Sequence, residues 1–409
     1  MTERLQPRNT PELVDAIRSA VAARTPFEIM SRGTKRGLGR PLRCDRILDL
    51  SALSGIDLYE PEELVMTAAA GTPLAEIGDA LAERRQQLAF EPPDLGPLLG
   101  AGAGQATIGG IFACNLSGSR RIKAGAARDH LLGFTAVSGR GEEFRAGGRV
   151  VKNVTGYDLP KLLTGSYGTL AAMASLTFKV LPAPETTRTL LLRGLDDASA
   201  IDALSRAAGS PFEVAGAAHL PAGPAARVLD GLAPAVGAAT ALRLEGFGPS
   251  VASRGGGLTA LLSPFGEVEL LDDDRSAVFW RRIRDVEPFV GDDRIVWRLS
   301  VPPADGAEAV AALGGGWEHY YDWGGGLIWI AAGIEAAGPD AGASRVRAAV
   351  SATSGHATLI RAPAEIRAAV DVFQPPAGAL AALSRRVKRS FDPEGVLNPG
   401  RMYAADLDE

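Results

Sequence analysis

The chain has 409 residues, of which 46% are hydrophobic and 22% charged, a composition typical of globular proteins that argues against disorder over most of its length. A single hydrophobic core stops growing below this length, so we expect two domains. The formal net charge is -5, with lysine and arginine scattered along the chain, which makes nucleic acid a poor candidate partner.

The two cysteines and the N-terminus indicate the compartment. Cys44 and Cys114 are the only cysteines and have no metal-ligand spacing, which favours a reducing compartment over a disulfide scaffold. Residues 1–21 carry charges and a proline where a secretory signal would be apolar, and are typical of a capped amphipathic helix. No apolar run approaches the roughly 20 residues of a membrane span. We therefore expect a cytoplasmic protein, attached to the inner face of the membrane only peripherally, through partners.

Residues 1–182 are predicted to form the first domain, in which strands alternate with helices. Residues 45–53 and 63–71 are strand candidates, and residues 72–88 have the apolar spacing of a helix. A segment rich in glycine and proline follows, up to residue 130. Residues 131–148 then indicate a β-hairpin, because a strand meets Ser-Gly-Arg-Gly and an alternating strand follows.

The proline-marked stretch at 181–189 is the predicted boundary of a second domain, residues 183–384. Its pattern repeats a coarse strand, helix, strand order, with residues 317–323 and 326–333 as a strand pair. This predicts a mixed or antiparallel sheet with helices on one face, and so an α+β domain. Residues 385–409 are predicted to be a tail laid over a surface, with a basic helix stopped by Asp392-Pro393.

Common catalytic motifs are missing, which narrows the chemistry. The chain has no GxSxG, HExxH or GxxxxGK[ST] sequence. Its four histidines, His130, His219, His319 and His356, do not have metal-ligand spacing, so we expect no metal site. The glycine-rich stretches at 98–110 and 323–329 lack the strand and helix context of a Rossmann fingerprint.

Three other glycine-rich segments form a more coherent set. They are "SRGTKRGLG" at 31–39, "ATIGGIFACNLSG" at 106–118 and "KNVTGYDLPKLLTGSYGTLA" at 152–171. Successive backbone N–H groups in conformations open to glycine can surround a nucleotide pyrophosphate. One such loop is weak support, but three of them within the first domain favour a nucleotide-binding site.

These segments resemble the FAD-binding domain of the vanillyl-alcohol oxidase type, also called PCMH-type. The resemblance covers residues 10–182 and the tail at 391–403, where "DPEGVLNPGRMY" looks like the family's C-terminal return. It implies a PCMH-type domain of two α+β subdomains followed by a smaller α+β cap domain. The cofactor that it implies is FAD.

Within that superfamily the chain is most similar to the FAD-binding subunits of bacterial glycolate oxidases. The features are Thr34-Lys35, "KNVTGYDL", "WRLSVP", "HATLIRAP" and the C-terminal ending, which together span the whole chain. The resemblance implies oxidation of glycolate to glyoxylate within a complex. It also implies two partners, a second FAD subunit with the hydroxy-acid site and an iron-sulfur subunit that carries electrons onward.

Two departures from wider superfamily patterns affect the chemistry. Residues 31–39 contain no histidine for covalent attachment, so we expect noncovalent FAD. The later half also lacks the HxGDGNxH motif of related 2-hydroxy-acid dehydrogenases, which argues against independent glycolate oxidation by this chain.

The residues assigned to FAD lie in the three loops and the tail. A structural role stays open for each loop: a tight turn at 34–37, close packing at 109–110, and helix caps by Thr155 and Asp158. The candidate cofactor-binding residues are Arg32, Gly33, Thr34, Lys35, Gly37, Thr107, Gly109, Gly110, Asn115, Ser117, Gly118, Lys152, Thr155, Gly156, Tyr157, Asp158, Gly165, Ser166, Gly168 and Asn398.

Catalytic residues are less defined. Strand alternation puts Arg298 on the opposite face from Trp297 and Leu299, and its planar guanidinium suits a carboxylate. Arg361 has a similar position near a strand end. For both arginines a structural salt bridge is the competing interpretation, and for His356 a packing or hydrogen-bonding role.

Other functions remain open at this point. The chain can be a flavin-bearing relay or scaffold without its own substrate site, or a self-sufficient FAD-linked oxidase of another hydroxy acid. A binding subunit that keeps the fold without the flavin is a further alternative. The sequence does not identify the terminal electron acceptor, the oxygen reactivity or the stoichiometry.

Overall fold

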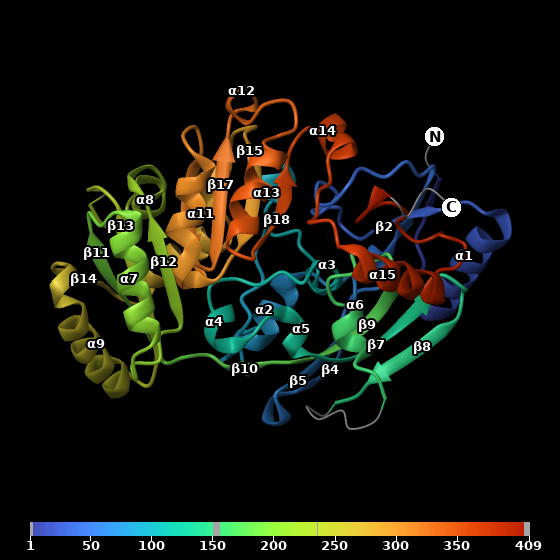
Figure 1. The fold of residues 1–409 in the computed structure, drawn as a ribbon. Coiled ribbons are helices and arrows are strands. Elements are labelled where there is room, and N and C mark those ends of the chain that lie inside the picture. Colours follow the sequence, from blue (N-terminus) through green and yellow to red (C-terminus); the bar gives the residue numbers. More distant parts are fainter. Residues whose placement is uncertain (1–2, 150–155, 235, 405–409) are drawn as a thin grey trace. The chain divides into compact units, whose positions relative to one another are not determined.

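The structure is a computed structural model that describes residues 3–149, 156–234 and 236–404. The chain divides into two compact units (Figure 1). Unit 1 comprises Met1–Ser117, Gly125–Ala183 and Asp371–Glu409, and unit 2 comprises Gly118–Ala124 and Pro184–Val370. This division puts residues 118–124 in unit 2 and residues 371–384 in unit 1, whereas the sequence-based boundaries place these two segments the other way round.

Unit 1 contains three sheets. A three-stranded parallel sheet has the order β1-β3-β2, an antiparallel sheet has the order β4-β5-β9-β7-β8, and β6 pairs with β10. The strands are β1 (Glu3–Leu5), β2 (Phe27–Met30), β3 (Arg46–Asp49), β4 (Ile56–Glu60), β5 (Val65–Ala69), β6 (Gln86–Gln87), β7 (Leu131–Ser138), β8 (Glu143–Gly147), β9 (Ala171–Lys179) and β10 (Leu181–Pro182). The helices are α1 (Thr10–Ala23), α2 (Leu74–Ala82), α3 (Ile108–Cys114), α5 (Ala127–His130), α6 (Leu159–Leu163) and α15 (Gly378–Phe391).

Two predictions for this unit are confirmed. The hairpin at 131–148 is formed by β7 and β8, which pair antiparallel from Gly133↔Gly147 to Val137↔Glu143. The N-terminal helix is α1, which begins where the sequence signals it. The side chain of Asn9 accepts from the N–H of Glu12 at 2.9 Å, and the Glu12 carboxylate accepts from Arg8 N at 2.8 Å. These two bonds satisfy backbone N–H groups at the start of the helix.

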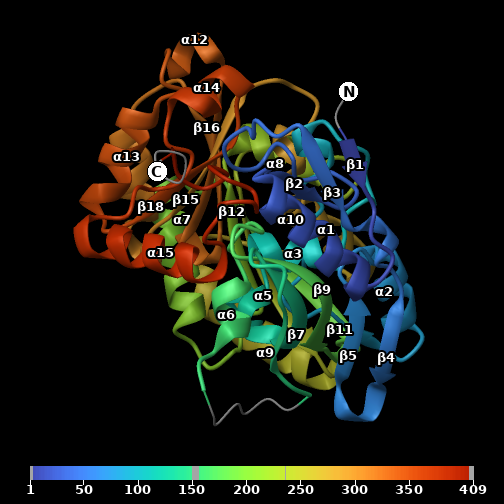
Figure 2. The same ribbon diagram turned by 90° about the vertical axis from the view of Figure 1, so that its right-hand side faces the viewer.

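Helix α1 packs in the core beside the parallel sheet (Figure 2). Its buried residues Leu13, Ile17 and Ala20 join a cluster with Phe27 and Leu48 of β2 and β3. Val396 and Leu397 of the C-terminal tail belong to the same cluster and are fully buried. The tail is therefore part of the core of unit 1, more deeply inserted than a segment laid over a surface.

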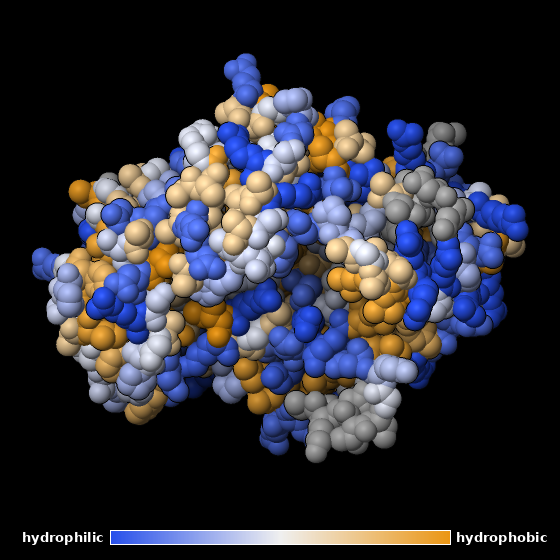
Figure 3. Space-filling model, in the orientation of Figure 1, coloured by the Kyte–Doolittle hydropathy of each residue, from blue (hydrophilic) through white to orange (hydrophobic). Residues whose placement is uncertain are grey.

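Helix α15 is anchored by its last turn. The ammonium of Lys388 donates to the carbonyls of Thr169 at 2.7 Å and Leu397 at 3.1 Å, and pairs with the buried carboxylate of Asp392. Apolar side chains gather on the outer face of the helix (Figure 3), where Leu380 and Leu383 are exposed. The Lys388 contacts and the packing of Phe391 against Phe144 position the last turn of this helix, in which no residue is fully buried.

Unit 2 is built on one eight-stranded sheet of order β14-β11-β13-β12-β16-β17-β15-β18, antiparallel throughout. The strands are β11 (Thr186–Arg193), β12 (Gly216–Leu220), β13 (Ala239–Gly246), β14 (Val268–Leu271), β15 (Ile295–Ser300), β16 (Glu318–Asp322), β17 (Leu327–Ala332) and β18 (His356–Arg361). The helices are α4 (Arg121–Ala124), α7 (Asp197–Ala208), α8 (Ala222–Leu229), α9 (Gly248–Leu262), α10 (Asp273–Arg284), α11 (Gly306–Leu313), α12 (Ile334–Ala337), α13 (Ala343–Ala352) and α14 (Ala364–Ala369).

The sheet of unit 2 consists of two halves of the same topology. In the first half the order is β14-β11-β13-β12. Its first strand in the chain, β11, thus lies between the last strand, β14, and the third strand, β13, as in a split βαβ unit. The second half, β16-β17-β15-β18, repeats this arrangement, and β12 and β16 join the halves. The strand pair predicted around 317–333 is confirmed as β16 and β17.

Helices cover both faces of this sheet, although not equally. Helices α7, α9, α11 and α13 contact one another as one layer (Figure 1). Helix α10 lies on the other face, because its Trp280 donates to Thr189 at 2.9 Å, whereas Gly255 of α9 approaches Leu244. Thr189 is paired with Arg243 across the ladder, so the two side chains share a face. Leu244 follows Arg243 in β13 and therefore points to the opposite face. The expected single helical face is thus correct for four helices and wrong for α10.

A polar cluster of two buried residues, His219 and Tyr321, and two partly buried ones, Asp197 and His319, lies where the two halves join. His219 of β12 pairs with Tyr321 of β16 in the ladder. Asp197, in the first turn of α7, accepts a hydrogen bond from the Tyr321 hydroxyl at 2.7 Å and lies 2.8 Å from Nε2 of His319 and 3.3 Å from Nε2 of His219. We call these four residues the junction cluster.

Membrane-spanning helices and metal-binding clusters are both absent from residues 3–149, 156–234 and 236–404. No helix there has the length and apolar character to cross a bilayer, and no group of three histidine, cysteine or acidic side chains is arranged to hold a metal ion.

Candidate functional site

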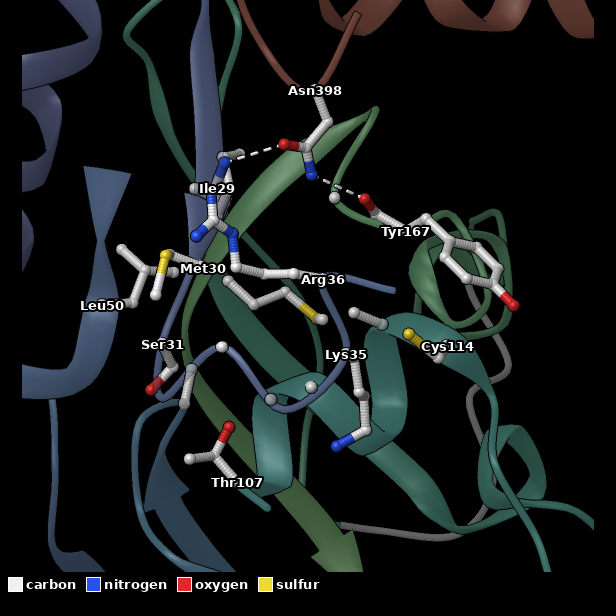
Figure 4. A pocket seen from close by; sticks show the side chains of 18 of the residues that line it. Ile29, Met30, Ser31, Lys35, Arg36, Leu50, Thr107, Cys114, Tyr167 and Asn398 are labelled. Carbon is white, nitrogen blue, oxygen red and sulfur yellow. Dashed lines mark hydrogen bonds between the residues drawn. The ribbon is translucent and has the colours of Figure 1, made fainter. Parts of the chain in front are cut away.

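A pocket in unit 1 brings together two of the three glycine-rich loops, part of the third, and the tail (Figure 4). It comprises about 810 Å³ of space, part of it open to solvent. The predicted residues that line it are Arg32, Gly33, Thr34, Lys35, Thr107, Gly109, Gly110, Gly168 and Asn398. The other lining residues are Ile29, Met30, Ser31, Arg36, Leu38, Leu50, Ala70, Ala113, Cys114, Tyr167, Ala171, Ala172, Met173 and Arg401.

The first loop leaves β2 at Met30 and presents backbone donors. Gly33 has a φ of +74°, which glycine adopts without strain. Among the described residues, no acceptor is found for the N–H groups of Gly33, Thr34 and Lys35, or for the buried hydroxyl of Ser31. Such donors favour an anionic ligand. Gly37, by contrast, faces Leu99 and does not line the pocket.

Arg36 and Arg401 hold this loop in place through hydrogen bonds to Glu28 and to backbone carbonyls. The buried carboxylate of Glu28 accepts hydrogen bonds from Arg36 at 2.8 Å and from Arg401 at 3.2 Å. The second terminal nitrogen of Arg401 reaches the carbonyls of Arg36 and Leu38 at 3.1 and 3.2 Å. Burial by itself raises the pKa of Glu28, but the hydrogen bonds and charges of the two arginines outweigh it and hold this pKa below its usual value.

Helix α3 forms a second wall of the pocket. The N–H of Gly109 donates to the carbonyl of Ala70 at 2.9 Å, and a Cβ on Gly109 would lie 2.6 Å from that oxygen. Close packing of the chain therefore requires this glycine. A Cβ on Gly110 would meet the Lys35 ammonium at 3.5 Å, so Gly110 and Lys35 face each other across the pocket wall.

The ionisable groups of the pocket are shifted by burial. Burial lowers the pKa of Lys35, partly offset by the nearby Cys114 and Asp94. Burial also raises the pKa of the Cys114 thiol to about 11, against the opposing charges of Lys35 and Arg401. Cys114 is therefore a neutral thiol at neutral pH. An anionic ligand would stabilise the charged form of Lys35, which burial disfavours.

Asn398 fastens the tail to the pocket. Its side-chain oxygen accepts from the N–H of Ile29 at 2.7 Å, and its side-chain nitrogen donates to the carbonyl of Tyr167 at 2.7 Å (Figure 4). A Cβ on Gly168 would lie 2.8 Å from that nitrogen. The side chain thus joins β2, the turn at 166–168 and the tail, and it acts as a positioning residue.

Two further candidates have protein partners. The side-chain oxygen of Asn115 accepts from Arg128 N at 3.2 Å, and the Ser117 hydroxyl accepts from Ala127 N at 2.9 Å. Both side chains hold the loop before α5, and neither is among the described residues that line the pocket. Their predicted contact with the cofactor stays a prediction.

The third loop is only partly in the pocket. Asp158 caps α6 by accepting from Lys161 N at 3.2 Å, and Tyr157 is 89% exposed. Gly156 and Gly165 have φ values of +85° and +84°, which suits turns. Ser166 is buried in the turn before Gly168. Two more candidates of this loop, Lys152 and Thr155, lie outside the described residues.

The catalytic candidates all belong to unit 2. Arg361 donates to the carbonyls of Arg294 and Phe289 at 2.8 and 2.9 Å and to Asp292 at 2.5 Å, which is a structural role. Arg298 stacks on Trp323 with its guanidinium carbon 5.0 Å from the ring centroid. His356 begins β18 and pairs with Ser300. Gly118, a cofactor candidate, is also in unit 2, where its carbonyl accepts from Trp323 Nε1 at 3.0 Å.

Three residues that support or line the pocket were not predicted from the sequence, because they lie outside the positions predicted within the loops. Arg401 and Glu28 support the first loop, and Cys114 lines the pocket at the end of α3. A buried acidic residue in a strand, next to a loop with three basic residues, was the available signal for Glu28. No comparable signal in the sequence pointed to Arg401 of the tail.

The pocket fits FAD by its chemistry. The free loop donors and Lys35 suit the negative charge of a pyrophosphate, whereas Met30, Leu38, Leu50 and Met173 provide apolar surface for a ring. Gly109 and Gly33 both line the pocket and have no side chain, so the backbone of α3 and of the first loop borders the pocket directly at these two positions.

Comparison with known proteins agrees with this chemistry. The model of a family described as "FAD binding domain" matches residues 4–147. The p-cresol methylhydroxylase structure with substrate bound shares the fold with a TM-score of 0.72, 14% identity, and coverage of 98% of this chain and 89% of that chain. The fold is therefore the PCMH-type FAD-binding fold predicted from the sequence, of class α+β.

Two bacterial relatives show closer kinship. The glycolate oxidase subunit GlcD of Bacillus subtilis (strain 168) is 31% identical over 188 residues, which cover 46% of this chain and 38% of the relative. The glycolate oxidase subunit GlcE of Escherichia coli (strain K12) is 33% identical over 395 residues, which cover 96% of this chain and 97% of the relative. The chain belongs to the family of FAD-binding oxidoreductase subunits that includes GlcE.

Proposed function

We propose that this chain is the FAD-bearing subunit of a complex that oxidises glycolate to glyoxylate. The observation that carries the proposal is the match to GlcE, because it spans 96% of this chain and 97% of the relative. Both units are included, so the likeness is not limited to the cofactor domain. Other relatives named D-lactate dehydrogenase match part of the chain, which supports a small 2-hydroxy acid as the substrate class.

The proposed roles of the pocket residues follow from their contacts. The N–H groups of the first loop and the Lys35 ammonium hold the anionic part of FAD, with Gly109 and Gly110 allowing close approach. Glu28 and Arg401 keep the loop in shape, and Asn398 ties it to the turn at 166–168. When bound, the flavin supplies the two-electron acceptor for the carbon that bears the hydroxyl.

The proposed partners are a second FAD subunit and an iron-sulfur subunit. Oxidation of glycolate releases two electrons and two protons, and the electrons must leave the flavin before the next turnover. The names of the relatives as subunits support an assembly of several chains. This chain lacks the histidine-rich motif of related dehydrogenases, which favours a relay role for its flavin as the second candidate function.

Co-purification tests the proposal. The chain is expressed alone and together with the proteins encoded beside it, and flavin and iron are counted in each product. We expect FAD in both, iron only in the complex, and rapid bleaching of the flavin by glycolate in the absence of oxygen only in the complex. A complex whose flavins stay oxidised with glycolate would contradict the proposal.

The same preparation separates the two candidate functions. If the FAD site of this chain is emptied by Gly109→Ala while the partners keep their flavin, a relay role predicts that glycolate still bleaches the partner flavin but electron transfer to the iron-sulfur centre stops. A substrate-oxidising role predicts that bleaching itself is lost.

A further inference from the structure

Helix α15 is amphipathic, but its apolar side is not buried. Leu380, Leu383, Val387 and Phe391 recur at spacings of three and four residues, so they lie along one side of the helix. None of the residues of α15 is fully buried, whereas the equally long α1 buries three residues of its apolar stripe. Because an amphipathic helix is stabilised chiefly by covering its apolar side, α15 has a side that a further surface can cover.

The exposed part of this stripe is its first half. Phe391 packs against Phe144 of β8, with the ring centroids 5.8 Å apart, and Lys388 ties the same end to two backbone carbonyls. By contrast, Leu380 is 59% exposed and Leu383 is 48% exposed. The last turn thus fixes α15 to unit 1, and the first two turns present their leucines to the outside.

Helix α6 adds a further exposed leucine nearby. It lies beside α15 in both views of the fold (Figures 1 and 2), and its Leu162 is 38% exposed. Figure 3 shows apolar side chains gathered over this part of unit 1. Gathered apolar side chains on the surface of a protein mark a site of interaction with another protein or with a membrane.

The polar side of α15 is basic. The whole chain has a formal net charge of -5, but this helix contains no acidic residue, and its basic residues are Arg385, Arg386, Lys388 and Arg389. Lys388 pairs with the buried Asp392, whereas Arg385 and Arg386 are exposed and have no ion-pair partner among the described residues. The exposed Glu394 follows the last turn, at the opposite end of the helix from the leucines. The first three turns therefore favour an anionic surface.

We propose that α15 docks this chain directly on a membrane surface that contains anionic lipids. A helix with leucines on one side, arginines on the other and a low overall hydrophobicity lies in the plane of the membrane interface. Leu380 and Leu383 enter the boundary between headgroups and acyl chains, and Arg385 and Arg386 reach the lipid phosphates.

The exposed apolar surface favours a membrane over a protein as the occupant. Two half-exposed leucines on one helix are few for a stable protein interface, which covers about 800 Å² of each partner. A membrane adds the attraction of its whole charged surface to this small apolar contact. The sequence led us to expect attachment to the membrane only through partners, whereas this contact is direct.

Vesicle sedimentation of the full-length, FAD-loaded chain tests the docking. The vesicles consist of phosphatidylcholine alone or of an equimolar mixture with phosphatidylglycerol. We expect at least a tenfold preference for the anionic vesicles, because each exposed arginine gains about fivefold in affinity near an anionic surface. An ionic strength of about 0.5 M should release the protein by screening. Equal binding to both kinds of vesicle, or no binding to either, would overturn the proposal.

Two double variants locate the contact on α15. One combines Leu380→Gln with Leu383→Gln and removes the apolar contact, and the other combines Arg385→Gln with Arg386→Gln and removes two charges. Each pair should weaken binding to the anionic vesicles about tenfold or more. FAD content and thermal unfolding should stay unchanged, because all four side chains are exposed.

Matched controls change the same residue types elsewhere on the surface. Leu270→Gln replaces a leucine of β14 that is 55% exposed, and Arg281→Gln replaces an exposed arginine of α10. Both controls should bind the anionic vesicles like the wild type. Wild-type binding in either test pair, or an equal loss in the controls, would show that α15 is not the docking surface.

A protein occupant gives a different result. In that case the chain stays in the supernatant with every vesicle, and the leucine pair instead abolishes co-purification with the proteins encoded beside it, which contradicts the proposal. The docking does not rest on the proposed function, because vesicle binding is measured without glycolate and without partners. A complex that fails to oxidise glycolate therefore leaves the vesicle result unchanged.

Discussion

The side-chain nitrogen of Asn398 donates to the backbone carbonyl of Tyr167 at 2.7 Å, although the two residues are 231 positions apart. The same side chain accepts from Ile29 N. Replacement by alanine leaves a donor and an acceptor without partners in a part-buried position. We expect a loss of about 1–3 kcal/mol in the free energy of unfolding and a lower FAD occupancy, measured by denaturation and by flavin absorbance.

Two further variants separate the causes. Asn398 has a φ of +43°, so part of the alanine effect is backbone strain. Asn398→Gly removes both bonds without that strain, and Asn398→Asp keeps only the acceptor. FAD occupancy at the wild-type level in the glycine variant would show that the side-chain bonds do not support the pocket.

Glycine at position 109 is predicted to be required for a well-formed pocket. A Cβ there would lie 2.6 Å from Ala70 O, so Gly109→Ala should shift α3, cost about 1–3 kcal/mol and reduce FAD binding. The control is Gly78→Ala in α2, where a Cβ meets nothing within 4 Å and a gain of about 0.5–1 kcal/mol is expected. Thermal unfolding and flavin content give both results, and equal behaviour of the two variants would contradict the prediction.

Local sequence patterns predict much of this fold, whereas the features that depend on contacts between residues distant in sequence could not be predicted. Asn9 with Glu12, and the alternation around Gly139, predict α1 and the β7/β8 hairpin because caps and turns are local. The loops with Gly33, Gly109 and Gly168 were identified as a set. The supports of the first loop were not, since Arg401 and Glu28 are 373 positions apart and nothing local to either residue signals the pair.

Some candidate residues had local alternatives that the sequence could not decide. Asp158 was a candidate for the cofactor or for a helix cap, and its contact with Lys161 N is that of a cap. Asn115 and Ser117 likewise bond to the backbone of a neighbouring loop. The same short polar side chains serve caps and ligands equally well, so only their tertiary positions distinguish the two uses.

The attachment of the flavin can be tested directly. Cys114 is the one nucleophilic thiol among the described pocket residues, and burial raises its pKa to about 11, which suppresses the reactive thiolate. We expect acid or urea denaturation to release all the flavin into the supernatant. Flavin that remains with the polypeptide in the wild type, but not in Cys114→Ala, would show a covalent link through this residue.

The junction cluster should make the stability of unit 2 depend on pH. Burial alone raises the pKa of Asp197, but hydrogen bonds from His219, His319 and Tyr321 outweigh it and hold this pKa far below its usual value. A carboxyl whose pKa is lowered by folding adds stability above its unfolded pKa of about 4 and loses that stability as the pH falls toward its folded pKa. Asp197→Asn should therefore destabilise the protein by about 2–4 kcal/mol at neutral pH.

The difference between the wild type and Asp197→Asn should then shrink between about pH 5 and pH 2, as measured by urea denaturation at each pH. The matched control is Asp202→Asn on the same helix, where the exposed carboxylate pairs with Arg206 at 2.8 Å and a loss below about 1 kcal/mol is expected. Because Asp197 contacts both β12 and β16, its loss should weaken the link between the two halves of the sheet, and amide exchange should rise first at His219 and Tyr321. A pH-independent difference, or an equal effect in the control, would show that the carboxylate does not hold this junction.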